Sequence, residues 1–222
     1  SGLVSHLRWR THQIDHAVSA AIARGARQCV VVGAGYDDRA HRLEALSRLP
    51  VWELDHPASQ RSKRDRTGRL YTLASQVVYV ALDLSHEDLA IRLLDAGFDP
   101  SLQTVWVWEG CTMYLPHDDI ATCLERMASI SAPASTLVST YAVPQLSPID
   151  ALTVHIARRF HWLGEPLEGL VSDADWQALI TARGWSNRHD QVCESVAPAF
   201  RAERVHQATR VARKHNQGDT RR

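Results

Sequence analysis

The sequence predicts an α/β fold with a mostly parallel sheet and helices on both faces. Short apolar segments that resemble strands alternate with segments of helical period, which is typical of this class. The five strand-like segments are residues 29–32, the segment that closes on Asp55, and residues 77–81, 105–108 and 136–141. Their apolar character predicts burial on both faces, as in parallel sheets. Two weaker segments near residues 188–193 and 204–211 predict an antiparallel hairpin at the sheet edge.

Length and composition predict one domain that covers residues 1–222. The chain has 222 residues and is 45% hydrophobic, which is enough for a complete core. Lys plus Arg number 25 and Asp plus Glu number 25, so no net charge favours nucleic acid or a membrane surface. The four cysteines lack C-x-x-C spacing, and the chain shows no signal peptide or transmembrane-length apolar run. These features predict a cytoplasmic protein without nucleic-acid or membrane partners. They leave the oligomeric state open, with a homodimer as one option.

The first three helices are predicted from apolar periodicity and from residues that begin or end helices. Residues 12–24 form the first helix, which Gly25 ends and a basic segment at residues 7–11 precedes. Asp37 is a suitable N-cap for the second helix, and Pro57 suits the first turn of the third. The inner face of the second helix is marked by Leu43, Leu46 and Leu49.

The later helices are predicted from their ends. The signals are a capping box of Ser85 with Asp88 and a stop at Gly97, Pro116 at the start of the next helix, and a capping box of Ser172 with Asp175. Between the last two helices, residues 142–171 mix prolines with aromatic and basic residues, and they are predicted to cap a substrate at the carboxyl edge of the sheet. Residues 214–222 are predicted to be a disordered tail.

A glycine turn follows the first strand and points to a cofactor with an adenosine group. Residues 33–35 read Gly-Ala-Gly, and twenty residues separate Gly35 from Asp55 at the end of the second strand. In α/β sheets this spacing places a nucleoside beside the turn, with its ribose toward the acid. Enzymes that bind dinucleotides use a third glycine, whereas this chain has Asp37 and Asp38, which would repel a pyrophosphate. The turn therefore disfavours NAD and FAD and favours S-adenosylmethionine.

Further polar residues follow successive strands and extend this candidate cofactor site. Parallel strands share one direction, so their ends should meet at one edge of the sheet. Asp55, with His56 beside it, is expected at the ribose, and Asp83 with the backbone of Leu84 at the adenine. The cofactor's ammonium and sulfonium are assigned to Glu109, Gly110 and the glycine turn Gly33, Ala34 and Gly35. Its carboxylate needs a cation, for which Arg10 or Arg8 is the candidate.

Residues 32–43 read VGAGYDDRAHRL, and further distinctive segments are residues 53–57, Lys63, and residues 81–84, 96–100 and 108–115. Together these segments resemble the leucine carboxyl methyltransferase family, and more closely its bacterial branch of O-methyltransferases linked to polyketide biosynthesis. The family pattern for the first segment is GAGxDTRxxRL, and this chain has Asp38 in place of the threonine. It implies a Rossmann-like class I methyltransferase fold with a seven-stranded sheet that binds S-adenosylmethionine. It also implies that Arg10 holds the cofactor carboxylate.

The acceptor is expected to be a small molecule, and a polyketide-type natural product is one candidate. Methyl transfer from a sulfonium is an in-line displacement in which the protein mainly aligns the reactants. A carboxylate acceptor needs no base, whereas a hydroxyl needs one, for which Tyr114, His155 and His161 are candidates. Tyr114, Tyr141 and Arg158 are candidates for substrate contacts. The sequence leaves ester and ether products open.

Three other classes of protein are weighed against this interpretation. A nicotinamide-dependent oxidoreductase is disfavoured by the missing third glycine. A non-catalytic adenosylmethionine-binding protein is a second alternative, favoured by the few residues that precede Arg10. A metal site is disfavoured because His12 and His16, one helical turn apart, have no third ligand at matching spacing.

Overall fold

The computed structural model describes residues 2–67, 70–144, 167–192 and 202–212. Within these residues the strands are β1 (Gln28–Val32), β2 (Pro50–Asp55), β3 (Gln76–Ala81), β4 (Thr104–Trp108), β5 (Thr136–Ala142), β6 (Trp185–Val192) and β7 (Glu203–Arg210). The helices are α1 (Gly2–Ala23), α2 (Arg39–Arg42), α3 (Pro57–Thr67), α4 (Leu89–Asp95), α5 (His117–Ser129) and α7 (Asp173–Ala182). Two short 3-10 helices are η1 (Glu44–Leu46) and η2 (Thr112–Tyr114).

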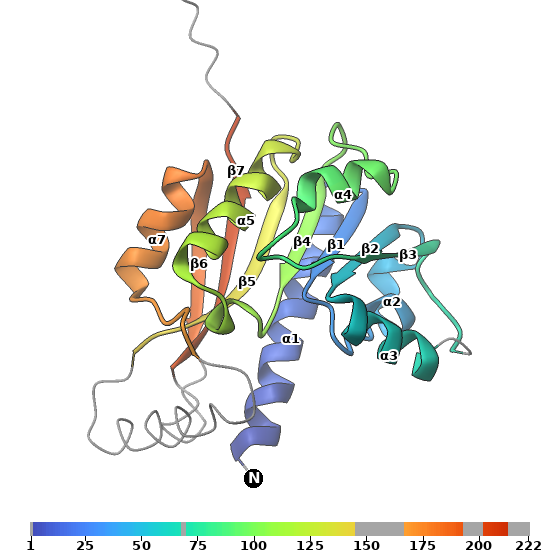
Figure 1. Cartoon of the computed structure of the whole chain (residues 1–222), viewed down its shortest axis with the longest axis horizontal. Helices are drawn as coiled ribbons and strands as arrows, with labels where there is room; N and C mark the ends of the chain where they lie inside the picture. Colours follow the sequence, from blue (N-terminus) through green and yellow to red (C-terminus); the bar gives the residue numbers. More distant parts are fainter. Residues whose placement is uncertain (1, 68–69, 145–166, 193–201, 213–222) are drawn as a thin grey trace, which may run out of the picture.

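The described strands form one sheet in the order β3-β2-β1-β4-β5-β7-β6 (Figure 1). β1 to β5 pair in parallel, whereas β7 pairs antiparallel with both β5 and β6. The predicted mostly parallel sheet and its antiparallel edge hairpin are therefore confirmed. Because β1 lies between β2 and β4, the glycine turn is flanked by the ends of these two strands.

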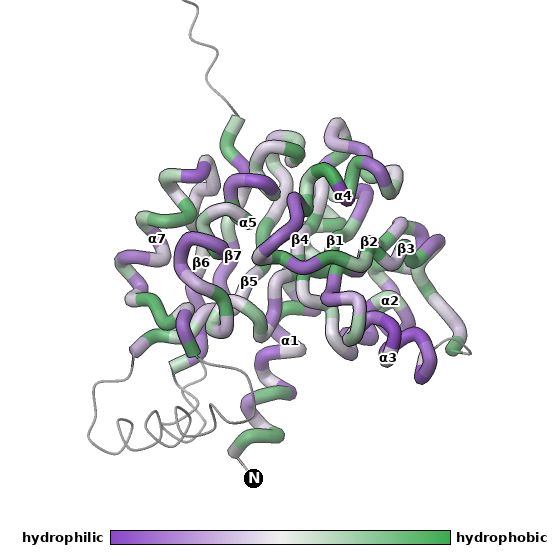
Figure 2. The backbone as a smooth tube through the Cα atoms, viewed as in Figure 1, coloured by the Kyte–Doolittle hydropathy of each residue, from purple (hydrophilic) through white to green (hydrophobic). Residues whose placement is uncertain are grey.

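Two apolar cores cover the two faces of the sheet, because successive side chains of a strand point to opposite faces. On one face, Val30 and Val32 pack in a cluster with residues of α4, α5 and α7. On the other, Cys29 and Val31 pack in a cluster with residues of α1 and with Leu46 of η1. By contrast, α3 is almost entirely hydrophilic in Figure 2, and its buried residues are Gln60 and Lys63. Helices on both faces were predicted and are confirmed.

The first helix is longer than predicted. α1 begins at Gly2, so the basic segment at residues 7–11 and Arg10 lie inside it and not ahead of it. No proline or glycine interrupts residues 3–24, and His6 and Arg10, one turn apart, both contact Glu203 of β7. Contacts to a distant strand therefore extend the helix beyond the apolar stripe that predicted it.

Two other predicted helix starts differ from the structure. The second helix breaks into α2 and η1 at Leu43, which has an extended backbone. Asp38 holds the N-cap position without a side-chain cap, and the carboxylate of Asp37, the predicted cap, accepts the N–H of Arg39 at 2.8 Å. The fourth helix begins at Leu89 with Asp88 as its N-cap, while the Ser85 hydroxyl donates to Asp119. The predicted cap at Ser172 is confirmed, since its hydroxyl accepts the N–H of Asp175. Helices also start at Pro57 and directly after Pro116, as predicted.

Candidate cofactor site

The glycine turn is fixed by the end of β2. Gly33 and Gly35 have φ values of 64° and 44°, a backbone region that favours glycine. Ala34 N–H donates to the carbonyl of Leu54 at 2.9 Å, which carries the sheet ladder past the end of β1. Gly35 N–H donates to the Asp55 carboxylate at 2.6 Å. The turn and the acid that were predicted to act together are therefore in direct contact.

Gly33 also has a steric reason to be glycine. A Cβ atom at this position would lie 3.0 Å from Cys111 Sγ and 3.2 Å from Cys111 Cβ. Cys111 follows Glu109 and Gly110, which come directly after β4. The close approach brings the loops after β1 and β4 together around one cavity.

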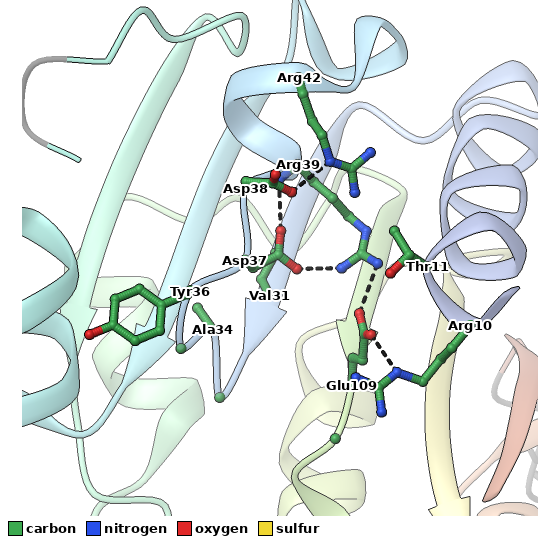
Figure 3. Close-up of a pocket in the computed structure, with 13 residues that line it drawn as sticks. Arg10, Thr11, Val31, Ala34, Tyr36, Asp37, Asp38, Arg39, Arg42 and Glu109 are labelled. Atoms are coloured by element: carbon green, nitrogen blue, oxygen red, sulfur yellow. Dashed lines mark hydrogen bonds and ion pairs between the residues drawn. The ribbon is translucent and has the colours of Figure 1, made fainter. Parts of the chain in front are cut away.

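This polar cavity has a volume of about 390 Å³ and opens beside the glycine turn (Figure 3). Its walls come from α1, from the turn and α2, and from the loop after β4. The lining residues are Arg10, Thr11, Val31, Gly33, Ala34, Gly35, Tyr36, Asp37, Asp38, Arg39, Arg42, Glu109 and Gly110. The cavity therefore brings together Arg10, the glycine turn, Glu109 and Gly110, all of which were predicted at the cofactor.

Arg39 lies at the centre of the charged wall. Its guanidinium is almost completely buried and pairs with Glu109 at 2.8 Å and with Asp37 (Figure 3). It also pairs with Asp15 of α1 at 2.7 Å. Burial alone would lower the pKa of Arg39, but the charges of Asp37, Glu109 and Asp15 raise it above its usual value. Arg39 thus stays charged and fixes the carboxylate of Glu109.

Arg10 pairs with two carboxylates that come from different parts of the sheet. Its Nε donates to Glu109 at 2.7 Å, and its Nη1 donates to Glu203 at 2.9 Å. Burial opposes its charge, but Glu203 and Glu109 raise the pKa of Arg10. Within the described residues no hydrogen bond uses Nη2, which lies 3.8 Å from where a Cβ on Gly110 would be. Arg10 therefore keeps one donor group beside Gly110. The alternative cation, Arg8, is exposed and does not line the cavity.

A buried ion pair between Lys63 and Glu53 stabilises the loop that follows the glycine turn. Lys63 of α3 donates to the Glu53 carboxylate at 2.5 Å and to the carbonyl of Asp37 at 2.6 Å. Burial raises the pKa of Glu53, and the charge of Lys63 opposes that rise. This pair connects α3, β2 and the loop that carries the cavity wall.

The outer predicted residues lie along the same edge but outside the cavity. Asp55 ends β2 and Asp83 follows β3, so the strand order places them successively further from Glu109. Both Asp55 oxygens accept backbone N–H groups, from Gly35 and from His56. Asp83 is partly exposed, and the hydrogen bond from Ser85 N–H and then His86 hold the pKa of its carboxyl below the usual range. His56, Asp83 and Leu84 do not line the cavity.

The structure places the residues predicted to contact the acceptor in different surroundings. Tyr114 of η2 is partly exposed and lines a second hollow. Tyr141 is completely buried, its hydroxyl donates to Asp173 at 2.8 Å, and its ring stacks on Trp176. It therefore has a packing role, because α7 covers the strand that carries it. His155, Arg158 and His161, and most of the predicted cap, lie outside the described residues, as does the predicted tail.

Sequence reasoning did not single out several residues of the site. Arg39 stands inside the segment that carries the family resemblance, and that signal could have identified it. Asp15 faces it from α1, and Glu203 lies 193 residues from its partner Arg10. No local pattern marks Asp15 or Glu203, because their partners are distant in the sequence.

Neither a metal-binding cluster of side chains nor a membrane-spanning helix is found in the part of the chain that the structure describes. No group of three or more histidine, cysteine or acidic residues there could hold a metal ion. No helix among these residues is long and apolar enough to cross a membrane.

Comparisons with known proteins show the family to which this chain is similar. The family model described as leucine carboxyl methyltransferase matches residues 1–128. A protein from Mycobacteroides abscessus is 35% identical over 195 residues, which cover 83% of this chain and 62% of that protein. A protein from Saccharopolyspora erythraea is 32% identical over 210 residues, which cover 90% of this chain and 69% of that protein. Both carry the name "putative S-adenosyl-L-methionine-dependent methyltransferase". The chain spans less than two thirds of the length of the first of these relatives, and 46% of another from Mycolicibacterium gilvum.

Solved structures show the same fold at low sequence identity. A duf574 family protein from Streptomyces avermitilis superposes with a TM-score of 0.75 at 14% identity, covering 94% of this chain and 85% of that chain. Magnesium protoporphyrin IX methyltransferase from Synechocystis PCC 6803 with bound SAH has a TM-score of 0.57 at 14% identity, covering 95% of this chain and 88% of that chain. The fold is therefore the class I methyltransferase fold that the resemblance implied.

Proposed function

Because the chain belongs to the leucine carboxyl methyltransferase family, we propose that it transfers a methyl group from S-adenosyl-L-methionine to an oxygen of a small molecule. The names of the two relatives give S-adenosyl-L-methionine as their cofactor. The proposed acceptor is a carboxylate or a hydroxyl, and a polyketide-type natural product is one candidate.

The observation that carries this proposal is the cavity between the ends of β1 and β4. It offers one donor group of Arg10 beside Gly110, the carboxylate of Glu109, and the backbone of the glycine turn. These groups complement a carboxylate, an ammonium and a sulfonium, which are the charges of S-adenosylmethionine. Asp55 then serves the ribose hydroxyls, and Asp83 with the backbone of Leu84 serves the adenine further along the edge. S-adenosylmethionine, which has no pyrophosphate, thus accounts for all of these residues, and a dinucleotide cofactor is not required.

The protein's own contribution to the proposed reaction is positional. The bound cofactor supplies a methyl group on a cationic sulfur. Arg39 holds Glu109, Glu203 holds Arg10, and Asp55 holds the glycine turn, so the groups around the cavity are fixed before anything binds. Such preorganisation lowers the entropic cost of aligning the acceptor oxygen with the methyl carbon.

Calorimetric titration with S-adenosylmethionine, S-adenosylhomocysteine and NAD tests the cofactor. We expect binding of the first two and none of NAD. Methyl transfer is then tested by incubating the protein with S-adenosylmethionine and a panel of carboxylic acids and phenols, with mass spectrometry of the products. Binding of NAD alone contradicts the proposal. Cofactor binding without methyl transfer to any acceptor favours a non-catalytic adenosylmethionine-binding protein.

A further inference from the structure

A second hollow, of about 410 Å³, adjoins the cofactor cavity. It is lined by Leu3, His6, Leu7, Arg10, Gly110, Met113, Tyr114, Ala142, Ala202 and Glu203. Arg10 and Gly110 line both hollows, so the two meet at these residues. A molecule in the second hollow would therefore lie next to a cofactor in the first. Assigning a ligand to this neighbouring space rests on the proposed function.

The outer wall of the second hollow is apolar. Leu3, Leu7 and Tyr114 are among the large apolar side chains that remain exposed, and Met113 and Ala142 continue the surface. Figure 2 shows apolar segments in the first turns of α1, which extend past the sheet. Apolar side chains from separate elements that gather around one concave space are typical of a binding site for an apolar ligand.

The floor of the hollow is polar, and its charges are already paired. Glu203 accepts a hydrogen bond from His6 at 2.6 Å and another from Arg10 at 2.9 Å. Arg10 also donates to Glu109, so a single guanidinium serves two carboxylates. Burial raises the pKa of Glu203, but the hydrogen bond from His6 and the charge of Arg10 outweigh it, so the carboxyl is ionised at neutral pH. An acceptor carboxylate would enter beside this negative charge, whereas a neutral hydroxyl would not be repelled.

We infer that this second hollow is the methyl-acceptor site and that its acceptor is an apolar molecule with a neutral hydroxyl group. Leu3, Leu7, Met113 and Tyr114 bind the apolar body, and Glu203 disfavours acids. In the transfer, the bond between the hydroxyl oxygen and the methyl carbon forms as the bond from that carbon to sulfur breaks. The hydroxyl proton passes to a general base as the bond forms and from that base to water, and the products are a methyl ether and S-adenosylhomocysteine.

The test uses 2-naphthol and 2-naphthoate, which have the same apolar body and differ in charge. Each is titrated calorimetrically into the 222-residue chain saturated with S-adenosylhomocysteine. We expect 2-naphthol to bind about tenfold or more tightly than 2-naphthoate, because the acid must approach an ionised carboxylate. Binding of S-adenosylhomocysteine is measured first, so its absence would reject the proposed function and not this assignment.

Two matched variants locate the site. Leu7→Asp places a charge on the apolar wall and should weaken 2-naphthol binding by about tenfold or more. Val4→Asp makes the same change at an exposed residue of α1 that does not line the hollow, and it should leave binding unchanged. Both variants should bind S-adenosylhomocysteine as the wild type does, since neither position lines the first cavity.

A third variant tests the role of Glu203. Glu203→Gln removes the negative charge and should reduce the preference for 2-naphthol over 2-naphthoate, which a purely structural role for this residue would not change. The inference is overturned if 2-naphthol does not bind the cofactor-loaded protein, if 2-naphthoate binds as tightly, or if Leu7→Asp and Val4→Asp behave alike.

Discussion

Asp55 has two separable tasks at the carboxyl edge of the sheet. One of its oxygens accepts the N–H of Gly35 at 2.6 Å, and the other accepts the N–H of His56 at 2.7 Å. Each carboxylate oxygen can accept more than one hydrogen bond, so these contacts leave capacity for the two ribose hydroxyls of the cofactor. A change at this residue should therefore affect both the turn and the affinity for the cofactor.

We expect Asp55→Ala to weaken binding of S-adenosylhomocysteine by about ten- to hundredfold, because hydrogen bonds to a charged group contribute about 1.5–3 kcal/mol. Asp55→Asn keeps an oxygen for Gly35 N–H and should retain more stability than Asp55→Ala while still binding the ligand weakly. Calorimetry measures the affinity, and urea unfolding measures the stability.

The control for this residue is Asp99→Ala. Asp99 is an exposed acid that accepts hydrogen bonds from Ser101 ahead of β4, at the opposite edge of the sheet. Its replacement should leave ligand affinity unchanged. An Asp55→Ala protein that is folded and binds S-adenosylhomocysteine as tightly as the wild type would show that the ribose lies elsewhere.

At the scale of an element, the turn after β1 demands glycine at two positions for different reasons. Gly33 has φ +64° and lies against Cys111, whereas Gly35 has φ +44° and open space, with no heavy atom within 4 Å of where its Cβ would be. A left-handed backbone alone costs an L-residue about 1–2 kcal/mol. Overpacking against a fixed neighbour adds about 1–3 kcal/mol.

We therefore expect Gly33→Ala to destabilise the protein more than Gly35→Ala does, by about 1–3 kcal/mol in the free energy of unfolding. Chemical denaturation of both variants measures the difference. Combining Gly33→Ala with Cys111→Ala should recover part of the loss, with Cys111→Ala alone as the reference. Equal effects of the two glycine substitutions would contradict the close contact between the loops after β1 and β4.

At the scale of the whole molecule, the first and last described elements are joined beside the site. Glu203 of β7 accepts from both His6 and Arg10 of α1, close to the shared wall of the two hollows. The pKa of Glu203 lies below the value of 4.5 that an unperturbed glutamate has. A carboxyl with a lowered pKa in the folded state contributes stability above its unfolded pKa and loses it as the pH falls through the folded pKa.

This prediction compares the free energy of unfolding of the wild type with that of Glu203→Gln. At neutral pH the wild type should be more stable by about 1–3 kcal/mol, because the variant loses the charged hydrogen bonds to α1. The difference should persist down to a pH of about 4.5 and shrink below it as Glu203 is protonated. Urea unfolding of both proteins across this pH range measures it. A stability difference that does not change with pH would mean that Glu203 is not ionised in the folded protein.

Much of the fold could be predicted because it is encoded locally. Each of these signals determines the backbone structure of residues close to it in the sequence: the apolar strands, Pro57, Pro116, the cap at Ser172 and the glycine turn. The start of α1 could not be predicted in this way, because His6 and Arg10 bind Glu203 on β7, which is distant in the sequence. The burial of Tyr141 could not be predicted for a similar reason, since its stacking on Trp176 depends on how α7 packs against the sheet.

The sequence alone predicts the α/β class, the turn at residues 33–35, its pairing with Asp55, and the choice of S-adenosylmethionine over a dinucleotide. These follow from hydrophobic period, backbone freedom and charge at fixed short spacings. The folded chain adds that Arg39 holds Glu109, that Arg10 is shared between Glu109 and Glu203, and that a second hollow adjoins the first. The physical reason is that a cavity and its ion pairs are formed by side chains far apart in the chain, and their distances are set by packing and not by spacing.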